Sequence, residues 1–362
     1  MPVPSAISLF SGAGGLDLGV EQAGFTVCAA VEHDSDACVS LRANFPEMAV
    51  IEGDIRRVST KELLAAAGLK AGDVDLLVGG PPCTPFSKSG YWLEHKRRGL
   101  DPEASLLEHY VRILDEARPQ MFLLENVFAL AYSNHNRMWL DFLLESFDRL
   151  GYGVTQQTVL AADYGVPQRR QRLILVGSLE GAPAMPSPTH NGPHERRVWK
   201  LGELDPHVTT GEAIGDLVDR DDLSEAEEVV AGKYGHLLPG IPPGDNYLFY
   251  TAKRGHPKPL FGWRKRYWSF LLKLDPGQPA PTIQAQPGPY VGPFHWDNRR
   301  LRVPEIKRLQ TFPDDFVIFG NRRSAQRQVG NAVPPLLARR IAEVLADGRL
   351  AQDESNQLAL AA

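Results

Sequence analysis

The chain has 362 residues, of which 43% are hydrophobic and 23% charged, a composition that is ordinary for a folded globular protein. Its net charge of −5 excludes a surface that attracts polyanions everywhere, so any nucleic-acid site must be local. The cysteines, Cys28, Cys38 and Cys83, are too few and too irregularly spaced for a disulfide framework or a zinc site. We expect no signal peptide, no membrane span and no metal.

The first half of the chain alternates short apolar runs with helical patterns. Strands are predicted at residues 6–10, 26–31, 49–52, 74–79 and 121–125, and helices at 16–23, 34–45, 59–67, 106–117 and 138–150. Two further strands at 154–160 and 173–177 are expected to form an antiparallel pair. This alternation predicts an α/β fold with a doubly wound, mostly parallel seven-stranded sheet.

The alternation stops in a stretch rich in proline, alanine and serine near residue 186. We therefore expect a first domain at 1–186, a smaller irregular domain at 187–300, and a C-terminal segment at 301–362 that returns to the first domain. Within these parts, the acidic run 219–228 is expected to be a solvated surface. A helix is predicted at 336–345, followed by a frayed end after Asp347.

A glycine-rich turn at residues 10–15 follows the first strand and opens the first helix. A dinucleotide fingerprint would need glycine at Asp17, so a ligand without phosphates, such as S-adenosylmethionine, is favoured. Glu32 ends the second strand and could accept both hydroxyls of a ribose. Asp54 follows the third strand and could accept an adenine amine hydrogen, with Ile55 against the ring. Taken singly, each acid could instead be an exposed residue or a turn cap.

Cys83 follows the apolar run 74–78, at the end of a predicted strand. A thiol there can be a nucleophile, although a free thiol with a pKa of about 8.5 is only slightly ionised at neutral pH. Glu125 closes the fifth predicted strand, and a carboxylic acid that keeps its proton can donate to a ring nitrogen. Because the carboxyl ends of parallel strands line one crevice, we expect Cys83, Glu125 and the glycine-rich turn to share a site.

A basic motif, Gln168-Arg169-Arg170-Gln171-Arg172, precedes the last strand. Strand alternation would direct Arg170 and Arg172 to one face, where guanidinium groups could stabilise a thiolate or hold a phosphate. A plain basic surface strand is the alternative.

With these motifs in this order, the chain resembles the DNA (cytosine-5)-methyltransferase family over nearly its full length. The turn at 10–15 looks like the first cofactor motif of that family. Pro82-Cys83 with Phe86, Ser87 and Gly90 looks like its catalytic loop, and Glu125-Asn126-Val127 like its glutamate motif. Gln168, Arg170 and Arg172 match its Gln-x-Arg-x-Arg motif, and residues 308–313 and 330–335 match its two closing motifs.

The resemblance implies a Rossmann-like S-adenosylmethionine-dependent methyltransferase fold and methyl transfer to carbon 5 of a flipped-out cytosine. It implies that the Cys83 thiolate adds to carbon 6, that Glu125 binds the ring at N3 and the exocyclic amine, and that Arg170 and Arg172 position the nucleotide and the thiolate. It also implies a set of cofactor-binding residues: Phe10, Gly12, Gly14, Gly15, Glu32, Asp54, Ile55, Pro81, Asn331 and Val333.

The segment at 187–300 would then be a target-recognition domain acting on double-stranded DNA. One window without acidic residues interleaves basic and aromatic side chains there, and further basic residues follow between 299 and 308. The DNA-contacting residues that we expect are Ser87, Ser89, Arg97, Lys253, Arg254, Arg264 and Arg266. Thr84 and Glu103 depart from the family pattern. We expect a monomer in the cytoplasm of a bacterium or archaeon, with a cognate restriction endonuclease that it does not contact.

Three other functions fit parts of the pattern. A tRNA cytosine-5 methyltransferase would use the same chemistry, but the large basic and aromatic insert favours DNA. A catalytically inactive DNA-binding relative is disfavoured because Cys83 and Glu125 are present. A Rossmann oxidoreductase is disfavoured by the missing third glycine of its fingerprint.

Overall fold

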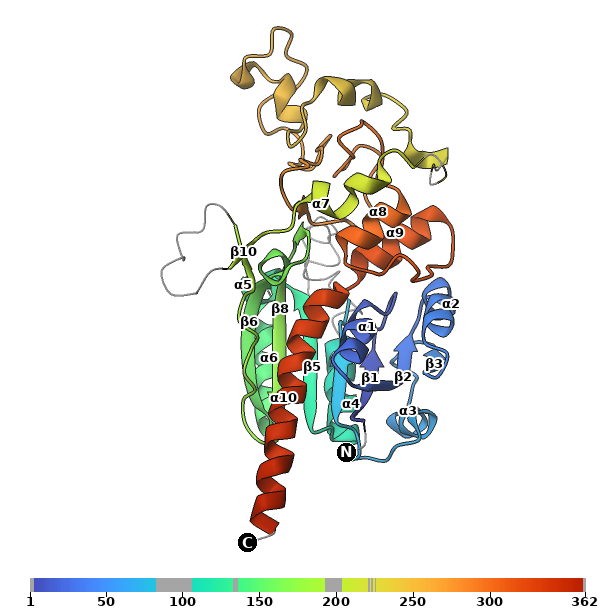
Figure 1. The fold of residues 1–362 in the computed structure, drawn as a ribbon, viewed down its shortest axis with the longest axis vertical. Coiled ribbons are helices and arrows are strands. Elements are labelled where there is room, and N and C mark those ends of the chain that lie inside the picture. Colours follow the sequence, from blue (N-terminus) through green and yellow to red (C-terminus); the bar gives the residue numbers. More distant parts are fainter. Residues whose placement is uncertain are drawn as a thin grey trace.

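A seven-stranded sheet lies at the centre of the molecule in a computed structural model, which describes residues 3–82, 106–132, 136–192, 204–220, 222, 224 and 226–360 (Figure 1). The strands, in spatial order, are β3 (Ala49–Glu52), β2 (Thr26–Glu32), β1 (Ser5–Leu9), β4 (Leu76–Gly79), β5 (Met121–Val127), β8 (Gln171–Ser178) and β6 (Gly153–Leu160). The first five are parallel, and β8 is antiparallel to both of its neighbours. The predicted fold class, including the antiparallel pair, is confirmed.

Helices cover both faces of this sheet, because its central strands are apolar on both sides. In β4, Leu76 and Val78 enter one core cluster and Leu77 the other. The helices α1 (Gly15–Gln22), α2 (Ser35–Asn44) and α10 (Pro335–Leu360) pack on the first face. The second face is covered by α3 (Thr60–Ala67), α4 (Leu106–Ala117) and α6 (Arg137–Arg149), with the short α5 (Ala129–Tyr132) at its edge.

The C-terminal helix α10 runs back along α1, beside the first strand (Figure 1). This approach requires Gly19, because a β-carbon there would lie 2.4 Å from both the Ala338 β-carbon and the Pro335 carbonyl oxygen. The expected frayed end after Asp347 is wrong, since the helix continues to Leu360. No helix in the described part of the chain is long and apolar enough to cross a bilayer.

The remaining segments stand beyond the end of the sheet at which the parallel strands finish (Figure 1). They consist of short elements: η2 (Ala161–Tyr164), β7 (Gln168–Arg169), β9 (His190–Asn191), β10 (Asp205–Pro206), α7 (Thr210–Ile214), η3 (Gly215–Leu217), η5 (Ala226–Glu228), η6 (Gly235–Gly240), η7 (Tyr247–Tyr250), η8 (Ala252–Arg254), β11 (Ala280–Pro281), α8 (Val303–Leu309) and α9 (Arg322–Asn331). A separate aromatic cluster that includes Tyr247, Phe270 and Phe294 forms the core of the part between Val230 and Phe294, whereas α7, β11, α8 and α9 pack into the first core cluster.

In the acidic run, Asp219, Asp222 and Glu227 are exposed as expected, and Glu228 is the exception among the described acids. It is buried, and its Oε1 atom accepts a hydrogen bond from the Arg302 Nε atom at 2.9 Å. Arg299 binds both carboxylate oxygens of Glu305 at 2.7 and 2.9 Å. The predicted basic surface between 299 and 308 is therefore largely an internal ion network that fastens the irregular region to α8.

Substituting Gly19→Ala tests the contact between α1 and α10. Overpacking of this kind costs about 1–3 kcal/mol, so the free energy of unfolding should fall in urea titrations. Gly215→Ala is the matched control, because Gly215 has helical backbone angles and nothing within 4 Å of its added β-carbon. The control should be neutral or slightly stabilising; equal effects of the two substitutions would contradict the close approach.

Candidate active site

β1 and β4 end level with each other beside Leu124 of β5, which continues to Val127. Leu9 pairs with Gly79, and Gly79 pairs with Leu124. The residues that follow Leu9, Gly79 and Leu124 therefore lie at the same edge of the sheet. Glu125 is the charged residue among them. β2 ends beside them at Glu32, because Leu9 also pairs with Val31. In an open parallel sheet this edge is where ligands bind.

Glu125 and Arg172 form a largely buried ion pair at this edge. The Arg172 Nε atom lies 2.6 Å from Glu125 Oε1, and the two side chains are only 12% and 10% exposed. The antiparallel register produces the contact, because Arg172 pairs with Val127, two residues beyond Glu125 on the same face. Within the described residues Oε1 has no hydrogen bond of good geometry, so this carboxylate keeps unmet capacity for a ligand donor.

The chain beyond β4 runs directly beside Glu125. A β-carbon on Gly80 would lie 3.4 Å from Glu125 Oε2, and the Asn126 Nδ2 atom donates to the Pro81 carbonyl at 3.2 Å. Both contacts fix the segment that leads to Cys83. Cys83 itself lies outside the described residues, as do the predicted DNA contacts Ser87, Ser89 and Arg97.

Arg170 does not share a face with Arg172, contrary to the prediction from strand alternation. It lies in the break between β7 and β8, and its buried guanidinium donates to the carbonyls of Gly330 and Asn331 at 3.0 and 3.1 Å. Gln168 donates to Gln310 Oε1 at 2.9 Å. Two residues of the basic motif thus hold the C-terminal segment, and only Arg172 reaches the candidate acid.

The glycine-rich turn is fastened to Glu32. Gly12 has a φ of +55° and donates its N–H to Glu32 Oε2 at 2.7 Å. Glu32 Oε1 accepts the N–H groups of His33 and Asp34 at 2.8 and 2.7 Å. An ionised carboxylate has about four acceptor sites, so Glu32 is held in place and can still accept a ligand hydroxyl. Phe10 has a φ of +58°, which is backbone strain of the kind found at functional sites.

Two of the predicted cofactor glycines are explained by packing. Gly14 precedes α1, where a β-carbon would lie 2.7 Å from the Phe45 ring. A β-carbon on Gly15 would lie 2.3 Å from the carbonyl oxygen of Val333, which is itself buried. Gly14 therefore allows the Phe45 ring to approach the turn, and Gly15 allows the chain around Val333 to do so. Asn331, at the end of α9, is exposed.

A groove of about 510 Å³ opens next to Asp54, within the size range of about 300–1,000 Å³ for small-molecule sites. Arg56 donates to both carboxylate oxygens of Asp54, and this hydrogen bonding lowers the pKa of Asp54 to about 2. Ile55 is buried in the second core cluster, so the prediction that it packs on an adenine ring is not supported. The groove is lined by His33, Ile51, Glu52, Gly53, Asp54, Arg57, Val58 and Glu62.

Asp17 is an acid that the sequence reasoning did not assign. It lies in the first turn of α1 beneath the glycine-rich turn and is fully buried. Burial raises the pKa of Asp17 to about 7, and the charges of Glu21 and Glu32 add to the rise, while the Ser8 and Ser11 hydroxyls lower it. Neither of its carboxylate oxygens has a hydrogen bond of good geometry within the described residues. The sequence shows that an acid occupies position 17, where a dinucleotide fingerprint would have glycine. It does not show that this acid is buried.

The predicted DNA contacts that are described lie together on exposed loops. Lys253 Nζ is 4.5 Å and the Arg264 guanidinium 5.8 Å from the centre of the Trp263 ring. Arg254 is paired with Asp245, and Arg266 lies over aromatic rings of the underlying core. The described residues contain no group of three acids, histidines or cysteines that could hold a metal ion.

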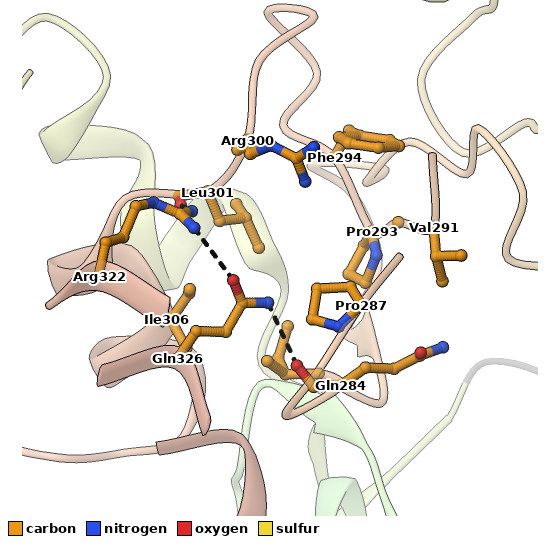
Figure 2. A pocket seen from close by; sticks show the side chains of 12 residues that line it. Gln284, Pro287, Val291, Pro293, Phe294, Arg300, Leu301, Ile306, Arg322 and Gln326 are labelled. Carbon is orange, nitrogen blue, oxygen red and sulfur yellow. Dashed lines mark hydrogen bonds between the residues drawn. The ribbon is translucent and has the colours of Figure 1, made fainter. Parts of the chain in front are cut away.

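A cavity between the irregular region and α9 is too small for a substrate. Figure 2 shows Arg322 of α9 donating to Gln326, which in turn donates to the Gln284 carbonyl at 3.2 Å. The cavity measures about 20 Å³, which is room for one water molecule. The cavity therefore lies within a closely packed contact between the irregular region and α9.

Residues 5–347 match the family described as C-5 cytosine-specific DNA methylase. The chain is 46% identical to the type II methyltransferase M.SacI of Streptomyces achromogenes, with 94% of this chain and 92% of that protein covered. It is 34% identical to M.XorII of Xanthomonas oryzae pv. oryzae, with 94% and 84% covered. The fold is similar to that of a methyltransferase, EhMeth, from Entamoeba histolytica, with a TM-score of 0.60, 18% identity and 96% and 99% of the two chains covered.

Removing the arginine of the buried ion pair should destabilise the protein. Arg172→Met leaves Glu125 without its partner, and losses of this kind are about 3–5 kcal/mol. Arg42→Met is the control, because the Arg42–Glu52 pair is 46% and 42% exposed and such pairs contribute about 0–1 kcal/mol. Denaturant unfolding measures both, and similar losses would contradict the burial of the Glu125–Arg172 pair.

Asp17→Asn should change how stability depends on pH. A carboxyl whose pKa is raised in the fold costs stability as pH rises from about 4 to 7, because it ionises more readily in the unfolded chain. The asparagine variant should therefore gain free energy of unfolding relative to the wild type over that interval and keep a constant difference above it. Glu108→Gln, at an exposed position on α4, should show no such gain; a parallel pH profile for Asp17→Asn would refute the assignment.

Proposed function

The chain belongs to the C-5 cytosine-specific DNA methylase family, and from this premise we propose that it methylates carbon 5 of a flipped-out cytosine in a short, specific site of duplex DNA, using S-adenosylmethionine. The observation that carries the proposal is Glu125. It stands at the aligned strand ends, ion-paired with Arg172, against the chain that leads to Cys83. We also propose that the enzyme modifies DNA as one half of a type II restriction–modification pair.

In the proposed reaction the Cys83 thiolate forms a bond to carbon 6 of the cytosine. Glu125 binds N3 and the exocyclic amine, which eases the attack, and the π electrons of the ring then make carbon 5 nucleophilic. When bound, S-adenosylmethionine would supply the electrophilic methyl group, so that a bond forms between this methyl and carbon 5, the bond from the methyl to the sulfonium sulfur breaks, and S-adenosylhomocysteine is the leaving group. A base removes the carbon-5 proton, the bond between sulfur and carbon 6 breaks, and Cys83 regains its thiolate. The cytosine must leave the base stack for this chemistry, at a cost of a few kcal/mol.

The two arginines have different proposed roles. Arg172 orients the Glu125 carboxylate through the ion pair and remains close enough to the site to contact the nucleotide. Arg170 is a positioning residue, because its guanidinium donates hydrogen bonds to the backbone carbonyls of Gly330 and Asn331.

The residues around the glycine-rich turn fit the cofactor. Glu32 is held by backbone N–H groups, retains an acceptor site for a ribose hydroxyl, and adjoins the strand end next to the Asp54 groove. Phe10, Gly12, Pro81 and Asn331 would complete the direct contacts. Gly14, Gly15, Ile55 and Val333 would support them through packing.

Duplex DNA is the preferred substrate because exposed basic and aromatic side chains gather on the irregular region. We propose that this region, residues 187–300, recognises the target and that residues 301–362 link it back to the catalytic domain at 1–186. The enzyme would act as a monomer in the cytoplasm of a prokaryote, and a cognate nuclease would read the same site without contacting it. A tRNA substrate is the competing proposal.

Methyl-transfer assays with radiolabelled S-adenosylmethionine test the reaction. Cys83→Ser should abolish transfer to duplex DNA, and Glu125→Gln should lower kcat by about 10²–10⁴-fold, the usual range for a proton-transferring group. Cofactor affinity, measured by calorimetry, should be unchanged in both. Bisulfite sequencing of plasmid from an expressing host identifies the site. Transfer to tRNA in place of DNA would overturn the substrate, and turnover by Cys83→Ser would overturn the mechanism.

A further inference from the structure

Two large aromatic side chains are exposed where the irregular region carries its positive charge. Tyr267 is 66% and Trp268 61% exposed. No acidic residue occurs between Asp245 and Asp275, whereas this interval contains seven lysines and arginines. A pair of neighbouring exposed rings in a cationic setting indicates a contact surface, since large rings are otherwise mostly covered.

The backbone beneath these rings is firmly anchored. The Asn246 Nδ2 atom donates to the Trp268 carbonyl at 2.7 Å, and the Tyr247 hydroxyl donates to the Arg266 carbonyl at 2.8 Å. The Phe270 N–H donates to the Tyr267 carbonyl at 3.0 Å. Because Tyr247 and Phe270 are buried, the two exposed rings are displayed by a rigid core, and little entropy would be lost when they meet a partner.

The surrounding cations fall into two groups. Arg254 is paired with Asp245, and Arg266 lies over the buried Phe270 ring at 5.5 Å, so both support the loop. Lys253 and Arg264 flank the Trp263 ring, and Lys265 is exposed beside them. The second group is available for phosphates.

We propose that Tyr267 and Trp268 form a stacking surface that contacts bases of the target duplex, while Lys253, Arg264 and Lys265 bind the adjacent phosphates. This inference rests on the proposed DNA methyltransferase function and assigns the DNA contact within it. Charge selects the occupant: an acid-free cationic surface suits a polyanion and would repel a second copy of itself. A base that is freed from the helical stack and stacks on an aromatic ring contributes about 1–3 kcal/mol.

The test uses the full-length enzyme and a duplex carrying the site found by bisulfite sequencing. Trp268→Ala and Tyr267→Ala should each raise the Kd of that duplex about 5- to 150-fold, the equivalent of the stacking energy. They should leave cofactor affinity, kcat at saturating DNA and the salt dependence of Kd unchanged. Phe319→Ala, at an exposed ring outside this region, is the matched control and should change none of these.

Charge variants separate the two groups of cations. Arg264→Gln and Lys265→Gln should each lower the slope of log affinity against log salt by about 0.9, the value for one phosphate contact. Arg254→Gln should leave the slope unchanged. An unaltered Kd for Trp268→Ala and Tyr267→Ala, in an enzyme that still methylates the duplex, overturns the stacking surface alone. A change in the sedimentation of the free protein with no change in Kd would assign the rings to self-association. A wild-type enzyme that methylates no duplex overturns the proposed function instead.

Discussion

The site depends on the common level at which β1 and β4 end beside Leu124 of β5. Hydrogen-bonded register leaves no freedom here, because a slip of one residue would turn every apolar side chain of a strand to the other face. The pairing of Gly79 with both Leu9 and Leu124 therefore fixes where the glycine-rich turn, the loop to Cys83 and Glu125 begin. Gly79 is itself required, since a β-carbon there would lie 2.9 Å from the buried Tyr110 ring.

A second constraint joins distant parts of the chain to that edge. Gln168 receives the N–H of Ile283 and donates to Gln310, and Arg170 holds the end of α9. Glu228 and Arg302 close a similar contact between the irregular region and α8. Buried hydrogen-bonded charges of this kind add little net stability, but breaking one is costly, so they fix one arrangement of the parts. These contacts supplement the first core cluster, which Ile214, Leu274, Ala280 and Ile283 of the irregular region share with one face of the sheet.

The sequence predicted the sheet because long apolar strands and capped helices are local patterns. Asp34 and Ser59 accept the N–H groups of Ala37 and Glu62, as their positions before helices indicate. The sequence-based predictions failed where contacts between distant parts of the chain determine the position of a side chain. Strand alternation gave Arg170 the wrong neighbours, because a break after Arg169 is invisible in composition. Local polarity likewise suggested a solvated Glu228, whose arginine partner is 74 residues away. The end of α10 was also predicted wrongly, since the helix continues to Leu360 beyond the last apolar residues.

The distribution of ion pairs explains why sequence motifs indicate a cationic region more readily than they identify the individual residues that contact DNA. With a net charge of −5, the protein can attract a polyanion only where cations lack internal partners. Arg302 is buried on Glu228, Arg299 on Glu305, and Arg308 is paired with Asp216 and Asp314. Phosphate contacts made by cations that lack such partners carry no sequence information, so discrimination between DNA sites must come from contacts to the bases.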